Sequence, residues 1–129
     1  MIGIEEIGQN AGKIWKTLNL QGPLTESRLM NSTMLDENQF QAAIGWLARE
    51  DKISKNGSFY RLGATNLTEK IGTDAGKLWD SLAKNTGCDV DISAISKLSH
   101  MDEKDAYSAL GWLAREDKIE SKNLIKLKR

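Results

Sequence analysis

The chain has 129 residues, with 18 basic and 18 acidic side chains and a formal net charge of zero. Residues 1–66 carry seven charges of each sign and residues 67–129 carry eleven of each, so neither half has the excess positive charge typical of a strongly electrostatic nucleic-acid binder. A single cysteine excludes an intramolecular disulfide, no apolar run is long enough to span a membrane, and we expect a cytoplasmic protein.

The first predicted element is a helix, because apolar residues recur at helical spacing near the start of the chain. These residues are Ile7, Ala11, Ile14, Trp15 and Leu18. Gly22 and Pro23 then interrupt the pattern. Leu24 follows as a short extended residue, and Thr25 is well placed to cap a short second helix through its hydroxyl oxygen.

A third helix is predicted to begin at Asp36, because acidic residues suit the positive end of a helix dipole. Its apolar face carries Phe40, Ala43, Ile44 and Leu47. At 100° per residue, the opposite face carries Asn38, Gln41, Ala42, Gly45 and Arg49, with Trp46 on the flank. We interpret this opposite face as the outward one.

The residues after the third helix predict a β-hairpin, since the apolar period changes from 3.6 to 2. Residues 53–55 and 58–62 flank Asn56-Gly57, a pair that favours a type I′ turn. Three helices closed by such a hairpin form a winged helix-turn-helix. The connector Gly63–Thr68 is short, so we expect the next unit to lie close by.

The second half of the chain repeats the first. The segment Ile71–Trp79 matches Ile7–Trp15, and the nonapeptide GWLAREDKI occurs identically at Gly45–Ile53 and Gly111–Ile119. Two extra residues are expected in a turn near Asn85–Cys88. Further matching features in the second copy are Val90 as an extended residue, Asp91 as a helix cap, and a weaker hairpin in which Asn123 replaces the turn glycine. The predicted fold is mainly α with small β-hairpins (α+β), as two tandem winged helix-turn-helix domains over 1–64 and 65–129.

The nonapeptide, preceded in each copy by a first helix containing Gly-Lys-Ile/Leu-Trp, resembles a family of small prokaryotic winged helix-turn-helix proteins without assigned function. Members are usually one unit long, and this chain looks like two units joined head to tail. The resemblance covers nearly the whole chain. It implies the fold and a nucleic-acid role, and it supplies no catalytic residues.

Our leading hypothesis is a transcriptional or chromosome-associated regulator that binds double-stranded DNA as an intramolecular pseudo-dimer. In winged helices the third helix can enter the major groove while the wing contacts phosphates. The candidate DNA-binding residues on these elements are Asn38, Gln41, Arg49, Lys55, Arg61, Lys104, Tyr107, Arg115, Lys122 and Lys126.

The alternative is a protein-interaction adaptor that binds no nucleic acid. Under either hypothesis the chain could also form a homodimer. Acidic residues at the start of each third helix favour this alternative, because they would repel phosphates. They are Asp36 and Glu37 in the first copy, and Asp102, Glu103 and Asp105 in the second.

Three features of the nonapeptide have two interpretations each. For the charged run Arg49–Lys52 we favour a structural role, with charges paired locally or to the first helix. Trp46 and Trp112 fit a core position better than an exposed anchor. Gly45 and Gly111 cost the helix roughly 1 kcal/mol each relative to alanine, which predicts close approach of either another helix of this protein or an external ligand.

No constellation predicts an enzyme, a cofactor or a small-molecule substrate. His100 is the only histidine, and neither it nor Cys88 has neighbours at metal-ligand spacing. His100 matches Met34 of the first copy, so we expect both to occupy a turn. We therefore predict no catalytic, cofactor-binding or metal-binding residues.

Overall fold

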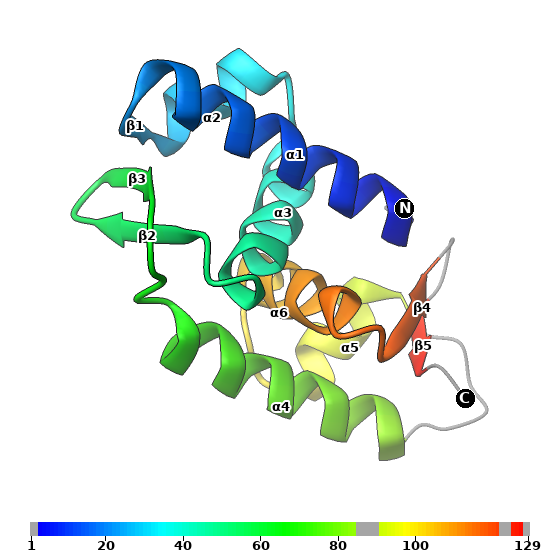
Figure 1. Ribbon diagram of the computed structural model, residues 1–129. Coiled ribbons are helices and arrows are strands. Elements are labelled where there is room, and N and C mark those ends of the chain that lie inside the picture. The colour runs from blue at the N-terminus through cyan, green and yellow to red at the C-terminus, as the bar shows by residue number, and fades with distance from the viewer. Residues whose placement is uncertain (1–2, 85–90, 122–124, 128–129) are drawn as a thin grey trace.

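The computed structural model describes residues 3–84, 91–121 and 125–127, with only the backbone described for 121 and 125–127 (Figure 1). The elements of the first repeat are α1 (Ile4–Gln21), β1 (Leu24–Thr25), α2 (Glu26–Thr33), α3 (Glu37–Arg49), β2 (Ile53–Asn56) and β3 (Phe59–Leu62). Those of the second repeat are α4 (Thr68–Lys84), α5 (Ile92–Leu98), α6 (Glu103–Arg115), β4 (Ile119–Ser121) and β5 (Ile125–Leu127). In the described part of the chain, no helix has the length and hydropathy needed to cross a bilayer.

Short polar side chains set where the helices begin. The Thr25 hydroxyl and the Asp91 carboxylate each accept a hydrogen bond from a backbone N–H in the first turn of the helix that follows, at 3.3 Å and 2.7 Å. Both predicted caps are thus confirmed. Asp36 forms a capping box with Gln39 at the start of α3, which satisfies two backbone donors that the helix itself cannot pair.

The wing of the first repeat is an antiparallel sheet with strand order β1-β3-β2. Asn56 pairs with Phe59, so the two loop residues are Gly57 and Ser58, and the predicted type I′ turn at Asn56-Gly57 is wrong. Only Gly57 has a positive φ, at 61°, which fits a type II′ turn. This register buries Tyr60 against Phe40, whereas a one-residue slip would turn Tyr60 towards solvent.

The second wing is described only in part. β4 pairs with β5 in antiparallel register, with Ile119 opposite Leu127 and Glu120 opposite Lys126. The predicted turn at Lys122-Asn123, the extra residues near Asn85–Cys88 and the extended residue Val90 all lie outside the described residues.

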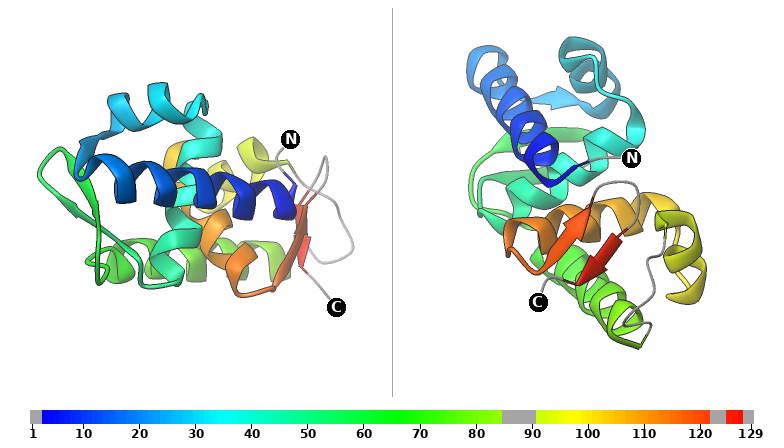
Figure 2. Two further views of the ribbon diagram at one scale, coloured as in Figure 1. Left: turned by 45° about the horizontal axis from the view of Figure 1, so that its top comes forward. Right: turned by 90° about the vertical axis from the view of Figure 1, so that its right-hand side faces the viewer.

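The two repeats pack together and exchange parts of their cores. Ile7 of α1 is fully buried in the cluster formed mainly by α4, α5 and α6, while Ile71 of α4 is buried in the cluster formed by the first repeat. α3 and α6 lie side by side at the centre, with α1 and α4 on opposite outer sides and the two wings at opposite ends (Figures 1 and 2). The expected proximity of the two units is confirmed.

The connector between the repeats is tied to the first wing. The side-chain amide of Asn66 accepts a hydrogen bond from the backbone N–H of Lys55 at 2.9 Å and donates one to its carbonyl at 2.7 Å. The N–H of Thr65 also donates to the Asp51 carboxylate, at 2.9 Å. Asn66 thus occupies hydrogen-bonding groups on the outer edge of β2, in the manner of a neighbouring strand.

Candidate functional site

Helices α3 and α6 cross at the centre of the molecule (Figure 1), and the two nonapeptide glycines lie in the contact between them. A Cβ atom at Gly45 would overlap the backbone carbonyl of Ser108, and one at Gly111 would overlap that of Ala42. The group that approaches each glycine is therefore the other helix of this protein. Because Ala42 matches Ser108 and Gly45 matches Gly111, the contact is the reciprocal kind found in two-fold symmetric interfaces.

Reciprocal ion pairs flank the glycine crossing. Nε of Arg49 lies 3.1 Å from Glu116, and Nε of Arg115 lies 3.0 Å from Glu50. Each guanidinium also lies 5.7 Å from the centre of the other repeat's tryptophan ring, at Trp112 and Trp46. The predicted structural role of this charged run stands. The expectation that it pairs only locally or to the first helix is wrong for the arginines, which bridge the two repeats.

Trp46 and Trp112 are half-buried and pack against both cores. Their six-membered rings lie over Gly8 of α1 and Gly72 of α4, with the nearest ring atoms 3.1 Å and 3.5 Å from where a Cβ would stand. The core interpretation of these tryptophans is therefore confirmed in part. The repeated nonapeptide acts mainly as an interface motif, supplying a contact glycine, an aromatic ring and a charge pair on each side.

The face of α3 interpreted as outward meets the second repeat. Gln41 is 4% exposed and Tyr107 is 6% exposed. The Gln41 side chain donates to Glu26 at 2.7 Å and accepts from the Ser108 hydroxyl at 3.1 Å, and burial is the main cause of a raised pKa at Tyr107. The outward placement is wrong for Gln41 and Tyr107. The helical periodicity separated the two faces correctly, but α6 covers the middle of the second face, while its ends stay exposed.

The other predicted DNA-binding residues that the structure describes lie on different parts of the molecule. Asn38 and Lys104 are exposed, and the Lys104 ammonium lies 3.6 Å from Glu26 and 3.9 Å from Glu37. Lys55 and Arg61 are exposed on the first wing, with the Lys55 ammonium 5.3 Å from the centre of the Tyr60 ring. Arg49 and Arg115 are held at the rim of the interface, and Lys122 and the side chain of Lys126 lie outside the described part. The DNA-binding role of all ten residues stays a prediction.

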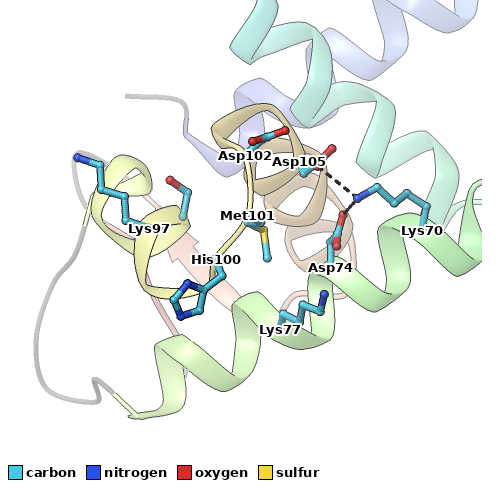
Figure 3. Close-up of a pocket in the computed structure, with 9 residues that line it drawn as sticks. Lys70, Asp74, Lys77, Lys97, His100, Met101, Asp102 and Asp105 are labelled. Carbon is cyan, nitrogen blue, oxygen red and sulfur yellow. Dashed lines mark hydrogen bonds and ion pairs between the residues drawn. The ribbon is translucent and has the colours of Figure 1, made fainter.

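A polar cleft of about 380 Å³ lies between α4 and the segment joining α5 to α6 (Figure 3). Lys70 spans it, with its ammonium 2.8 Å from Asp74 and 3.2 Å from Asp105. The hydrogen bond to Asp74 is the main cause of a raised pKa at Lys70, although partial burial opposes it. His100 lines the cleft and, like Met34, has the left-handed φ expected of a turn, at 55° and 58°. The charges in the cleft neutralise one another, so it does not favour a ligand of either sign.

A second hollow, which we call the tryptophan groove, lies between α4 and α6 and measures about 350 Å³. Its lining consists of Gly72, Ala75, Gly76, Trp79, Asp80, Trp112, Leu113, Glu116 and Lys118. Sequence reasoning missed this groove. The signal available was Gly76, a second helical glycine that the apolar pattern does not require.

The fold and this central interface define a class of protein: two winged-helix units that pack against each other through their third helices. A family model described as a winged helix-turn-helix domain (DUF2582) matches the chain twice, over residues 3–61 and 67–126. The chain belongs to this family, and the resemblance and fold predicted from the sequence are confirmed. The domain boundaries at 64 and 65 stay predictions. No curated protein and no solved structure matches the chain.

Proposed function

We propose that this chain is a non-catalytic adaptor that binds other proteins through the outer surfaces of a preassembled winged-helix pseudo-dimer. The winged helix-turn-helix fold is one that DNA-binding regulators commonly use. One observation favours a protein partner over major-groove recognition: the middle of the α3 face that would read bases is packed against α6. A helix can enter the major groove only with a face open to the DNA.

Exposed aromatic side chains supply a second argument for a protein partner. Trp15 on α1 is 39% exposed and Trp79 on α4 is 40% exposed, and they occupy matching positions in the two repeats. Tryptophan is enriched at protein interfaces, where a large, rigid ring contributes more binding energy than most side chains. The zero net charge also suits a protein partner better than a polyanion.

The proposal is tested by affinity purification from the native host with the full-length chain as bait. Trp15→Ala and Trp79→Ala serve as surface variants, and Gln9→Ala on exposed α1 surface serves as a matched control. We expect specific proteins to co-purify in stoichiometric amounts with the wild type and the control, and to be lost with one tryptophan variant. Recovery of no stoichiometric protein, together with tight binding of duplex DNA, would overturn the adaptor proposal.

Binding of DNA phosphates by the first wing is a second candidate function, favoured by three exposed cations on one hairpin. Lys52, Lys55 and Arg61 are all exposed, and Lys122 and Lys126 are the proposed counterparts in the second wing. Three phosphate contacts predict that the logarithm of the association constant falls with the logarithm of salt concentration with a slope of about −2.7. Fluorescence anisotropy with a labelled duplex measures this slope, and replacing all three first-wing cations by alanine should flatten it. A duplex that does not bind at low salt excludes this candidate.

A further inference from the structure

The floor of the tryptophan groove is formed by Gly76, a helical glycine that no packing contact requires. A Cβ atom built at Gly76 meets no atom within 4 Å outside its chain neighbours and the adjacent helix backbone, although Gly76 lies in the middle of α4. Glycine in a helix interior is unfavourable relative to alanine. Gly45 has a packing reason for this, because its Cβ would overlap Ser108, whereas Gly76 has none. What Gly76 does provide is an uncovered stretch of helix beside two aromatic rings.

Aromatic and acidic side chains surround that floor. Gly76, Trp79 and Asp80 share one face of α4, because residues three and four positions apart are neighbours on a helix. Trp79 is 40% exposed, and Trp112 forms part of the facing wall from α6. The Trp112 ring already attracts the guanidinium of Arg49, so a cation–aromatic contact is part of the chemistry of this region.

Asp80 is the carboxylate in the groove that has no cationic partner among the described residues. The other acid in the lining, Glu116, is already paired with Arg49 at 3.1 Å and with Lys118 at 3.5 Å. The first repeat has the matching Gly12 and Trp15 but carries Lys16 in place of Asp80. The two repeats therefore differ in the sign of the charge that stands beside the same glycine and tryptophan.

We propose that the tryptophan groove binds a lysine or arginine side chain from an extended basic segment of a partner protein. The aliphatic stem lies over Gly76, and the cationic end contacts the Trp79 ring and pairs with Asp80. This inference rests on the proposed adaptor function and names one contact by which it operates. The occupant is cationic because Asp80, which has no cationic partner among the described residues, and the aromatic faces of the groove both attract positive charge.

The test is a titration of the full-length protein with a blocked pentapeptide that has a central lysine, followed by NMR of the four tryptophan indole N–H signals. We expect saturable shifts of Trp79 and Trp112, with Trp15 and Trp46 unmoved. A peptide with norleucine in place of lysine has the same stem without the charge, and it should cause little shift. Equal binding of the two peptides, or the absence of saturable shifts at Trp79, would overturn the proposal.

Matched variants separate groove binding from stability. Gly76→Leu fills the groove and should abolish the Trp79 shift while raising the melting temperature, because leucine favours helix over glycine. Gly12→Leu, at the matching open site of α1, should raise the melting temperature and leave the Trp79 shift unchanged. Asp80→Asn should weaken binding by about three- to fivefold, the effect of losing one exposed ion pair. Unchanged binding by Gly76→Leu would contradict the proposed site.

The reverse exchange tests the role of charge in the first repeat. Lys16→Asp gives α1 the same glycine, tryptophan and aspartate that α4 carries, so the lysine peptide should now shift the Trp15 indole as well. No shift at Trp15 would contradict the assignment of specificity to this position. Failure of the peptide experiments alongside co-purification of stoichiometric protein partners would reject the groove and leave the adaptor function standing, whereas failure of both would reject both.

Discussion

At the residue scale, Gly45 has a steric role that Gly12, another helical glycine of the same repeat, does not share. A methyl group at Gly45 would overlap the Ser108 carbonyl, while one at Gly12 would meet nothing within 4 Å. Gly45→Ala should therefore lower the free energy of unfolding by about 1–3 kcal/mol through overpacking. Gly12→Ala should stabilise it by about 0.5–1 kcal/mol through helix propensity. Urea unfolding of both variants measures the contrast, and two changes of the same sign would contradict the helix crossing.

Tyrosine 60 makes the fold sensitive to alkaline pH. Burial is the main cause of its raised pKa, with the nearby charge of Glu26 adding to the effect. Below pH 10 the phenol is protonated in both the folded and unfolded chains. Above pH 10 the unfolded chain loses this proton while the folded chain retains it, so the free energy of unfolding falls as pH rises.

The slope should approach about 1.4 kcal/mol per pH unit for this one group. Urea unfolding of the wild type and of Tyr60→Phe between pH 8 and pH 11.5 measures it, and the variant should lose less stability over the alkaline range. The raised pKa values of Tyr107 and Lys70 act in the same direction in both proteins. Identical pH profiles for the two proteins would show that Tyr60 ionises as readily in the folded state as in the unfolded one.

At the element scale, the edge strand β2 depends on a side chain that lies outside the sheet. Asn66 makes two hydrogen bonds to the backbone of Lys55. Asn66→Ala removes both and should cost about 1–2 kcal/mol of stability, with faster hydrogen exchange at the Lys55 amide. Asn66→Asp keeps an acceptor for that amide and loses the donor, so it should preserve exchange protection better than the alanine variant. Equal exchange rates in all three proteins would exclude this role.

Local rules predicted most elements because each depends on residues close in the chain. The spacing of Ile7 to Leu18 identified the first helix, and the capping oxygens of Thr25 and Asp91 identified the starts of α2 and α5. The hairpin turn was misplaced by one residue, since the burial of Tyr60 against Phe40 sets the register and that contact is tertiary. The local preference of Asn56-Gly57 for a type I′ turn favoured a strand register one residue away from the observed one.

The functional surfaces were harder to predict because they depend on what covers each helix. The sequence separated the two faces of α3, but it did not indicate that the face with Gln41 meets α6. Gly45 did indicate close approach, and the small residue three positions earlier, Ala42, matches Ser108 at the same contact. Such paired small positions in both copies could have favoured helix–helix packing over an external ligand. The tryptophan groove left a weaker signal in Gly76, which matches Gly12, because the facing wall comes from α6 and its position beside α4 is a tertiary contact.

At the scale of the whole molecule, the exchange of core residues between repeats predicts that they unfold as one unit. Ile7 is buried among residues of the second repeat and Ile71 among those of the first. A unit of about 60 residues is marginally stable by itself, and neither repeat here completes its own core. Differential scanning calorimetry should therefore show one transition, with equal calorimetric and van't Hoff enthalpies.

A core truncation confined to one repeat provides the sharper measurement of this coupling. Phe40→Ala, deep in the first repeat and fully buried, should destabilise the chain by about 3–5 kcal/mol. If the repeats are coupled, the indole signal of Trp79 in the second repeat should report the same shifted urea midpoint as that of Trp15 in the first. Two midpoints, with Trp79 unaffected by the truncation, would mean that the α3–α6 interface joins two independently folding domains. The chain would then be a flexible pair of domains, whereas coincident midpoints describe a single rigid body that presents both outer tryptophans in fixed relation to each other.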